Sequence, residues 1–192
     1  MLNKEYWDDK WIRGESGWDL GKPSPPLMQY IRTSIPKEAR IIIPGSGRGY
    51  EAGTAFQEGY VNVFYNDISP FAVREFRSLY PEFPEEQILL SDFFLLNEKF
   101  DFCLEQTSFC AHPPSRRLEY LEQVHKILKP EGRYAGVFFD IRFPFEGPPF
   151  GGNKKEYESL FLNYLRIIKM EKCYNSAKPR VDTELFVISS PK

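Results

Sequence analysis

Three consecutive isoleucines, Ile41 to Ile43, lead through one proline into a turn with glycine at positions 45, 47 and 49. β-Branched side chains favour a strand, and glycine lets a turn adopt left-handed conformations and come close to a ligand. The helix predicted over residues 50–58 would point free N–H groups and its positive dipole end at that turn. This pattern predicts a strand–turn–helix unit that binds a nucleotide-type ligand. The turn alone leaves the ligand open, because its third glycine comes one position earlier than in the dinucleotide fingerprint and Tyr50 takes that place.

Short apolar runs alternate with helix-like stretches along the whole chain. Ser69 and Pro70 are typical of a helix start, and a Lys-Pro-Glu-Gly turn at 129–132 is predicted to end another helix. We expect strands over residues 40–44, 61–66, 87–90, 100–105, 134–139, 165–170 and 184–189, and helices over 50–58, 70–80, 115–128 and 154–164. This alternation predicts an α/β fold with a parallel sheet and helices on both faces, in a single domain spanning residues 1–192.

Composition narrows the class of protein further. Hydrophobic residues make up 42% of the 192 residues, so a sizeable core is expected, and the net charge of -2 favours neither nucleic acid nor an anionic membrane as partner. No apolar run approaches the ~20 residues of a membrane span, and the charged start has no secretory h-region. Three cysteines without CxxC spacing argue against a disulfide framework and against a zinc site. We therefore expect a cytoplasmic monomer without a metal.

Acidic side chains follow the second and third predicted strands. Parallel sheets bind ligands beyond the carboxyl ends of their strands, and Asp67 stands there, some twenty positions beyond the glycine turn. Its carboxylate suits a ribose diol, although a helix-starting aspartate is the alternative. Asp92 beside Phe93 suits an adenine, which would be held by the carboxylate and stacked on apolar neighbours; the alternative is a solvated loop acid.

The fourth predicted strand ends in another polar stretch. Glu105 and Gln106 stand where groups nearest the reacting atom are expected. His112 is either a general base, since its intrinsic pKa is near neutrality, or an exposed or capping residue before two prolines. Arg116 and Arg117 begin the next helix, at the end that disfavours cations. This indicates a site role for one of them; the alternative is ordinary surface charge.

All three tryptophans lie in the segment before the first strand. Trp7 and Trp11 have helical i, i+4 spacing, and Trp18 follows in a stretch rich in glycine and proline. They are either core anchors or part of a lid that covers a cationic ligand through cation–π contacts.

These motifs together resemble a known family. The chain resembles the S-adenosylmethionine-dependent methyltransferases of the thiopurine methyltransferase superfamily. The motifs that carry the resemblance are the runs IIIPGSGRG, NDIS, SDFF and EQTSFCAHPP, the tryptophan-rich start, GPPF at 147–150 and the tail SAKPRVDTELFVI. The greatest resemblance is to the halide/thiol, or harmless-to-ozone-layer, branch. It implies a Rossmann-like class I methyltransferase fold, with a seven-stranded, mostly parallel sheet closed by an antiparallel hairpin. The chain departs from that branch at Ser46, which is often cysteine there, and at Gln106 or Ser108, where an aromatic residue is common.

The resemblance also implies roles for individual residues. Residues 1–30 would cover the cofactor, Gly45 and Gly47 would contact its methionine part, and Gln106 would line its methyl end. The full set implied to bind S-adenosylmethionine is Trp7, Trp11, Trp18, Gly45, Gly47, Asp67, Asp92, Phe93 and Gln106. Glu105, Phe109 and Arg116 would contact the acceptor, while Arg180 and Glu184 of the closing hairpin are interpreted as structural.

The expected reaction is in-line transfer of a methyl group to a small soft nucleophile: a thiol, a selenol, a tellurium species or a halide. The expected product of the cofactor is S-adenosylhomocysteine. A free thiol is already a few per cent ionised near neutrality, so no catalytic base is required. Two alternatives remain, a nicotinamide-dependent oxidoreductase and a non-catalytic protein that binds an adenosyl cofactor. The sequence does not identify the acceptor.

Overall fold

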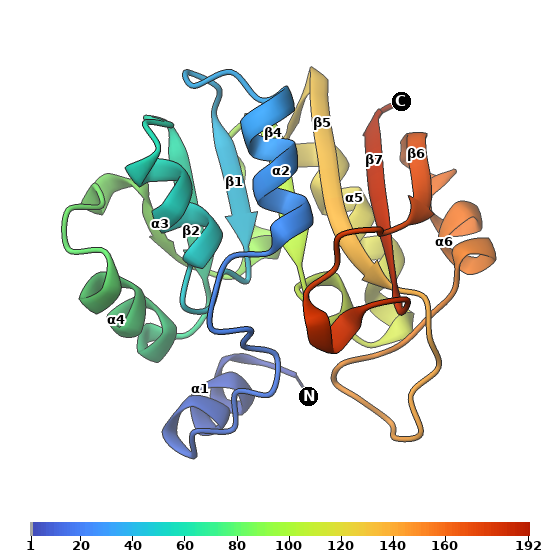
Figure 1. Ribbon diagram of the computed structural model, residues 1–192, viewed down its shortest axis with the longest axis horizontal. Coiled ribbons are helices and arrows are strands. Elements are labelled where there is room, and N and C mark those ends of the chain that lie inside the picture. Colours follow the sequence, from blue (N-terminus) through green and yellow to red (C-terminus); the bar gives the residue numbers. More distant parts are fainter. Residues whose placement is uncertain (1) are drawn as a thin grey trace.

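A computed structural model describes residues 2–192, so Met1 of the predicted covering segment lies outside the described part. The described chain forms a seven-stranded sheet with the order β3-β2-β1-β4-β5-β7-β6 (Figure 1). The strands are β1 (Ile41–Pro44), β2 (Val63–Asp67), β3 (Ile88–Leu90), β4 (Phe100–Gln106), β5 (Leu128–Phe139), β6 (Leu165–Lys172) and β7 (Glu184–Pro191).

The sheet is mostly parallel, as the alternation of strands and helices predicts. Strands β1 to β5 pair with their neighbours in parallel, whereas β7 runs antiparallel to both β5 and β6. The predicted closing hairpin is therefore present. The strand order reverses between β1 and β4, so their carboxyl ends flank the crevice where ligands bind in open α/β sheets.

Helices cover both faces of the sheet. One face carries α2 (Pro25–Ser34), α3 (Tyr50–Gln57) and α4 (Pro70–Leu79), and the other carries α5 (Arg117–Ile127) and α6 (Lys154–Phe161). A further helix, α1 (Lys4–Ile12), lies beyond the sheet edge toward which β1 points (Figure 1). None of these helices, nor any other in the part of the chain described, is long and apolar enough to cross a membrane.

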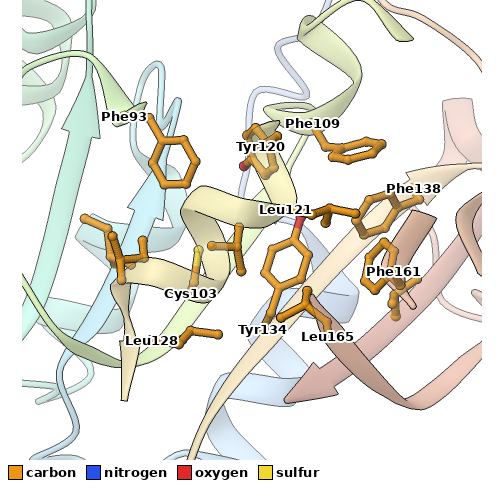
Figure 2. Close-up of a cluster of buried hydrophobic side chains, with 14 of the residues drawn as sticks. Phe93, Cys103, Phe109, Tyr120, Leu121, Leu128, Tyr134, Phe138, Phe161 and Leu165 are labelled. Atoms are coloured by element: carbon orange, nitrogen blue, oxygen red, sulfur yellow. The ribbon is translucent and has the colours of Figure 1, made fainter. Parts of the chain in front are cut away.

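Two apolar cores pack between the sheet and its helices. Figure 2 shows the core beneath α5, where Tyr120 of the helix and the rings of Phe93, Phe109, Phe138 and Phe161 belong to one buried cluster. Aromatic pairs there include Phe109 and Phe138, with ring centroids 4.9 Å apart. Burial of so many large side chains makes the sheet a rigid platform for the loops at its carboxyl edge.

The structure corrects two details of the predicted elements. The Lys-Pro-Glu-Gly segment at 129–132 is part of β5 rather than a separating turn, because the β4–β5 register shifts between Phe100 and Phe102 and this irregularity accommodates the segment. Helix α5 begins at Arg117, because a short 3₁₀ turn, Pro114–Arg116, precedes it. Helix α2 was not expected from the sequence, although Pro25 and Pro26 at its first turn are typical of a helix start.

Local chemistry explains how α3 and α4 begin. Ser69 accepts a hydrogen bond from the N–H of Phe71 over 3.3 Å, so the predicted N-cap is confirmed. Gly49 precedes α3 with a φ of 66°, and a side chain there would overlap the ring of Phe76.

We expect Gly49→Ala to lower the free energy of unfolding by about 3 kcal/mol, because left-handed strain and a clash in the core add together. Gly59→Ala is the matched control: its φ is 89°, but nothing lies within 4 Å of the added methyl group, so we expect a loss of about 1 to 2 kcal/mol. Denaturant titration of both variants measures the difference. Equal losses would show that Phe76 does not restrict position 49.

Candidate functional site: a cavity at the carboxyl edge of the sheet

A cavity of about 770 Å³ lies at the carboxyl ends of the parallel strands, within the size range of sites for drug-sized ligands. Its walls come from the N-terminal segment, from the loops after β1 to β4, and from the loop after β5. The predicted site residues that line it are Trp7, Trp11, Trp18, Gly45, Gly47, Asp67, Asp92, Phe93 and Arg116. Asp67 and Asp92 thus open onto one common cavity.

The glycine turn and Asp67 form one hydrogen-bonded unit. The N–H of Gly47 donates to Oδ2 of Asp67 over 2.9 Å, and the N–H of Ser69 donates to Oδ1 over 2.9 Å. Tyr65 donates to the carbonyl of Gly47 over 2.7 Å. Each Asp67 oxygen keeps a lone pair for a further donor, so this carboxylate can accept hydrogen bonds from a diol. Burial raises the pKa of Asp67 to about 6.

The three indoles gather above Gly47. Trp18 makes edge-to-face contacts with Trp7 and Trp11, with ring centroids 5.5 and 5.8 Å apart. A methyl group added at Gly47 would be 3.7 Å from Nε1 of Trp18 and 3.8 Å from Cζ2 of Trp11. The indoles therefore form a roof over the glycine turn instead of anchoring the core.

Polar contacts fasten this roof to the rest of the fold. Ser69 donates to Asp8 over 2.6 Å, which joins α1 to the start of α4. Arg48 of the glycine turn pairs with Asp19 at 3.0 Å. Arg180, which precedes β7, donates to the carbonyl of Trp18 over 2.9 Å. Three separate parts of the fold thus hold the N-terminal segment over the cavity.

Asp92 and its neighbours form a second wall. Asp92 accepts a hydrogen bond from the N–H of Phe94 over 3.0 Å, which fixes its carboxylate at the end of β3. The Arg116 guanidinium lies 4.1 Å from the centroid of Phe94, and Arg116 also pairs with Glu119 at 2.6 Å. The wall therefore combines one anion and one cation with an aromatic surface.

His112 lines the same wall in its neutral form. Burial, together with the nearby Arg116, lowers its pKa to about 4. Its Nδ1 is buried without a hydrogen-bond partner, and its ring contacts Phe94 edge-to-face at 5.2 Å. A base with so low a pKa takes up little proton at neutral pH, so His112 is poorly suited to general-base catalysis.

The loop between β5 and α6 supplies an apolar wall. Its cavity-lining side chains, with the last residue of β5, are Phe139, Phe143, Phe145, Pro148 and Pro149. Three cations, Lys10, Arg116 and Arg180, also line the cavity. Three acidic side chains, Glu15, Asp67 and Asp92, line it as well, so the lining offers both cationic and anionic groups beside its apolar wall.

Three predicted contacts do not reach this cavity. Glu105 and Phe109 are buried beneath it and do not line it; Glu105 accepts from the N–H of Phe109 over 3.0 Å. Gln106 lines a smaller adjoining hollow of about 60 Å³, with its Nε2 3.5 Å from Oε1 of Glu184. Glu105 and Phe109 are thus supports under the β4 loop rather than parts of the lining.

Arg180 is a cavity residue that the sequence did not reveal as one. The predicted structural role is present, since the guanidinium pairs with Glu184 at 3.5 Å and both side chains are buried. The same side chain also lines the cavity. Nothing in the sequence separates the two roles, because the tail reaches the cavity only through the antiparallel pairing of β7. Across residues 2–192, no cluster of three or more His, Cys, Asp or Glu side chains is placed to hold a metal.

The fold is that of the class I S-adenosylmethionine-dependent methyltransferases. The structure of 1,6-didemethyltoxoflavin-N1-methyltransferase from Burkholderia thailandensis, solved with S-adenosylhomocysteine, superposes with a TM-score of 0.77 at 17% identity, covering 98% of this chain and 86% of that one. A TehB-like methyltransferase from Corynebacterium glutamicum gives a TM-score of 0.70 at 16% identity, covering 98% of both chains.

The sequence profile of the thiopurine S-methyltransferase (TPMT) family matches residues 2–188, and the chain belongs to this family. Probable thiol methyltransferase 2 of Arabidopsis thaliana is 32% identical over 81% of this chain and 71% of its own length. Thiopurine S-methyltransferase of Vibrio cholerae is 26% identical over 84% of this chain and 82% of its own. The chain is an S-adenosylmethionine-dependent methyltransferase, and nothing in these comparisons supports the oxidoreductase alternative.

The buried carboxyl of Glu105 makes stability depend on pH. Burial and the nearby Glu184 raise its pKa to about 8, so the folded protein holds a proton that the unfolded chain releases near its ordinary value of 4.5. The stabilisation linked to this proton is complete below the unfolded-state pKa and is lost as the pH rises through about 8. We expect the unfolding free energy of the wild type to fall relative to Glu105→Gln by up to ~1.4 kcal/mol per pH unit in this window.

Urea titrations at several pH values between these two limits measure the difference. Glu122→Gln, on the exposed side of α5, is the control and is expected to keep a constant difference from the wild type. A constant difference for Glu105→Gln as well would contradict a buried, protonated carboxyl.

Proposed function

We propose that this enzyme methylates a small soft nucleophile, with a thiol as the first choice and a selenol, a tellurium species or a halide as further candidates. The observation that carries the proposal is the acceptor side of the cavity, which is aromatic and cationic and has no effective base. His112 is the one histidine on the cavity walls of the described chain, and its pKa of about 4 makes it a poor base. An acceptor that ionises by itself suits such a wall. Relatives named thiol and thiopurine methyltransferases support this choice.

We propose that the sheet edge holds S-adenosylmethionine as follows. Asp67 accepts hydrogen bonds from the ribose hydroxyls, Asp92 and Phe93 hold the adenine, and Gly45 and Gly47 contact the methionine part. The residues fit this group, because the Asp67 oxygens keep free lone pairs and the indole roof offers π faces to a cation. Residues 1–30, of which 2–30 are described, would then serve as the cofactor-covering segment.

The cofactor supplies a methyl group already activated on a positively charged sulfur. What remains for the protein is to align the acceptor, to exclude water and to attract an anion. The apolar side chains Phe139, Phe143 and Phe145 line this space and would displace water from around a bound acceptor. Transfer from a cation to an anion is favoured in dry surroundings because two charges disappear. Arg116 and Arg180 line the same space and would attract a thiolate. Alignment near contact distance lowers the barrier further.

Incubation with methyl-labelled S-adenosylmethionine and a panel of thiols, selenols, tellurite and iodide tests the proposal. We expect labelled product with at least one thiol, without an added metal. Transfer to none of the panel, despite binding of the cofactor, would contradict the proposal and favour the non-catalytic alternative. Transfer to a halide but to no thiol would exclude the preferred acceptor while keeping the soft-nucleophile class.

The role of Asp67 predicts how cofactor binding depends on pH. Because its pKa is about 6, the carboxylate is ionised above that pH and protonated below it. We expect the Kd for S-adenosylmethionine, measured by calorimetry, to rise by up to about tenfold per pH unit below pH ~6. Asp67→Asn should weaken binding at neutral pH by about tenfold or more and remove this pH dependence.

Asp101→Asn is the matched control, because Asp101 lies at the start of β4, at the far end of the sheet, and pairs with Lys129 at 2.8 Å. Its Kd should follow that of the wild type at every pH. If Asp67→Asn did so too, the ribose assignment would be wrong.

A further inference from the structure

Arg117 is a charged side chain in an unfavourable place. Only 1% of the side chain is exposed, and it stands at the first residue of α5, where the positive end of the helix dipole disfavours a cation. A buried charge is tolerated only when partners compensate for the lost hydration. The hydrogen-bond partners of Arg117 therefore indicate its role in the fold.

The guanidinium joins three parts of the chain. Its Nη2 donates to the carbonyl of Gly151 over 2.8 Å and lies 3.4 Å from that of Phe150, while Nη1 pairs with Glu156 of α6. The guanidinium carbon also lies 5.4 Å from the ring centroid of Phe109. Arg117 thus connects the start of α5 to the end of the loop between β5 and α6.

That loop, residues 140–153, is the apolar wall of the cavity. It carries Phe143, Phe145, Pro148 and Pro149, and Phe145 is still 53% exposed. Its backbone bonds to the rest of the fold are concentrated at its two ends. The N–H of Asp140 donates to the carbonyl of Thr183 over 2.7 Å, and the N–H of Phe150 donates to the carbonyl of Cys110 over 2.7 Å. A bond from Gly152 to the carbonyl of Ile141, over 3.0 Å, joins the two ends of the loop to each other. The position of the wall therefore depends on the few contacts at residues 150–152.

We infer that Arg117 is a positioning residue for the methyl acceptor: it holds the apolar wall in place without touching either ligand. Arg117 itself does not line the cavity. A planar guanidinium can bind a carboxylate and backbone carbonyls at once, whereas a lysine ammonium lacks this fork. The hydrogen bonds that hold the glycine turn and Asp67 come from Gly47, Tyr65 and Ser69, and none of them involves this loop. Arg117 and its loop are therefore expected to affect the affinity for the acceptor without changing the affinity for the cofactor.

The test uses Arg117→Lys, which keeps the charge but loses the fork, and it rests on the proposed function for its kinetic part. We expect the KM for the thiol acceptor to rise about tenfold or more, with the Kd for S-adenosylmethionine unchanged within about twofold. The control is Arg133→Lys, because Arg133 also donates to two backbone carbonyls, of Glu131 and Gly132, both over 2.8 Å, but at the far end of β5. It should leave both constants unchanged.

Hydrogen exchange followed by mass spectrometry provides a readout that does not need an acceptor. Arg117→Lys should lose protection in peptides covering residues 142–152, while peptides covering the glycine turn stay protected. If Arg117→Lys does not fold, Glu156→Gln, which alters the half-exposed partner, should give the same two effects more weakly.

The outcomes separate the two proposals. If Arg117→Lys loses protection of the loop but the wild type is inactive on every acceptor, the role of Arg117 in positioning the loop is supported and the proposed function is overturned. Unchanged loop protection, or equal changes in acceptor KM and cofactor Kd, would overturn the positioning role.

Discussion

The hydrogen bond from the backbone N–H of Gly47 to the carboxylate of Asp67 organises the functional edge of this sheet. It ties the turn after β1 to the end of β2, at the point where the strand order reverses. Because this bond holds the turn against the end of β2, Trp11 and Trp18 can lie directly above Gly47. The same carboxylate keeps acceptor capacity on the cavity side. A single buried acid therefore shapes the turn, the roof and the proposed ribose contact together.

The other buried ionisable side chains divide the support of the cavity among separate elements. Glu105 braces the loop after β4 through the N–H of Phe109. The pair of Arg180 and Glu184 joins the closing hairpin to the carbonyl of Trp18. Arg117 fastens the apolar wall. Buried charges contribute little net stability once dehydration is counted, so their arrangement here is better explained by the positions that they impose on the cavity walls.

Much of the site could be predicted because strand ends in a parallel sheet meet at one edge. Asp67 and Asp92 could be assigned to a common cavity from their places after β2 and β3 alone. At β4 the same reasoning did not separate Glu105 from Gln106, since neighbouring residues of a strand point to opposite faces. Glu105 points with Cys103 into the core under α5, whereas Gln106 points to the face of α2 and α3. A shift of one residue in the predicted strand end reverses that assignment.

The sequence by itself determined the parallel α/β architecture, the glycine turn, the two acids at strand ends and the family, because these depend on local patterns and on short spacings along the chain. Only the tertiary structure decided the acceptor side. Arg180 reaches the cavity through the pairing of β7 between β5 and β6, and Arg117 reaches the loop at Gly151 across 34 residues of chain. Such contacts depend on long-range packing. The sequence does not show whether a given arginine is buried or exposed, so sequence patterns do not reveal which arginine supports the site.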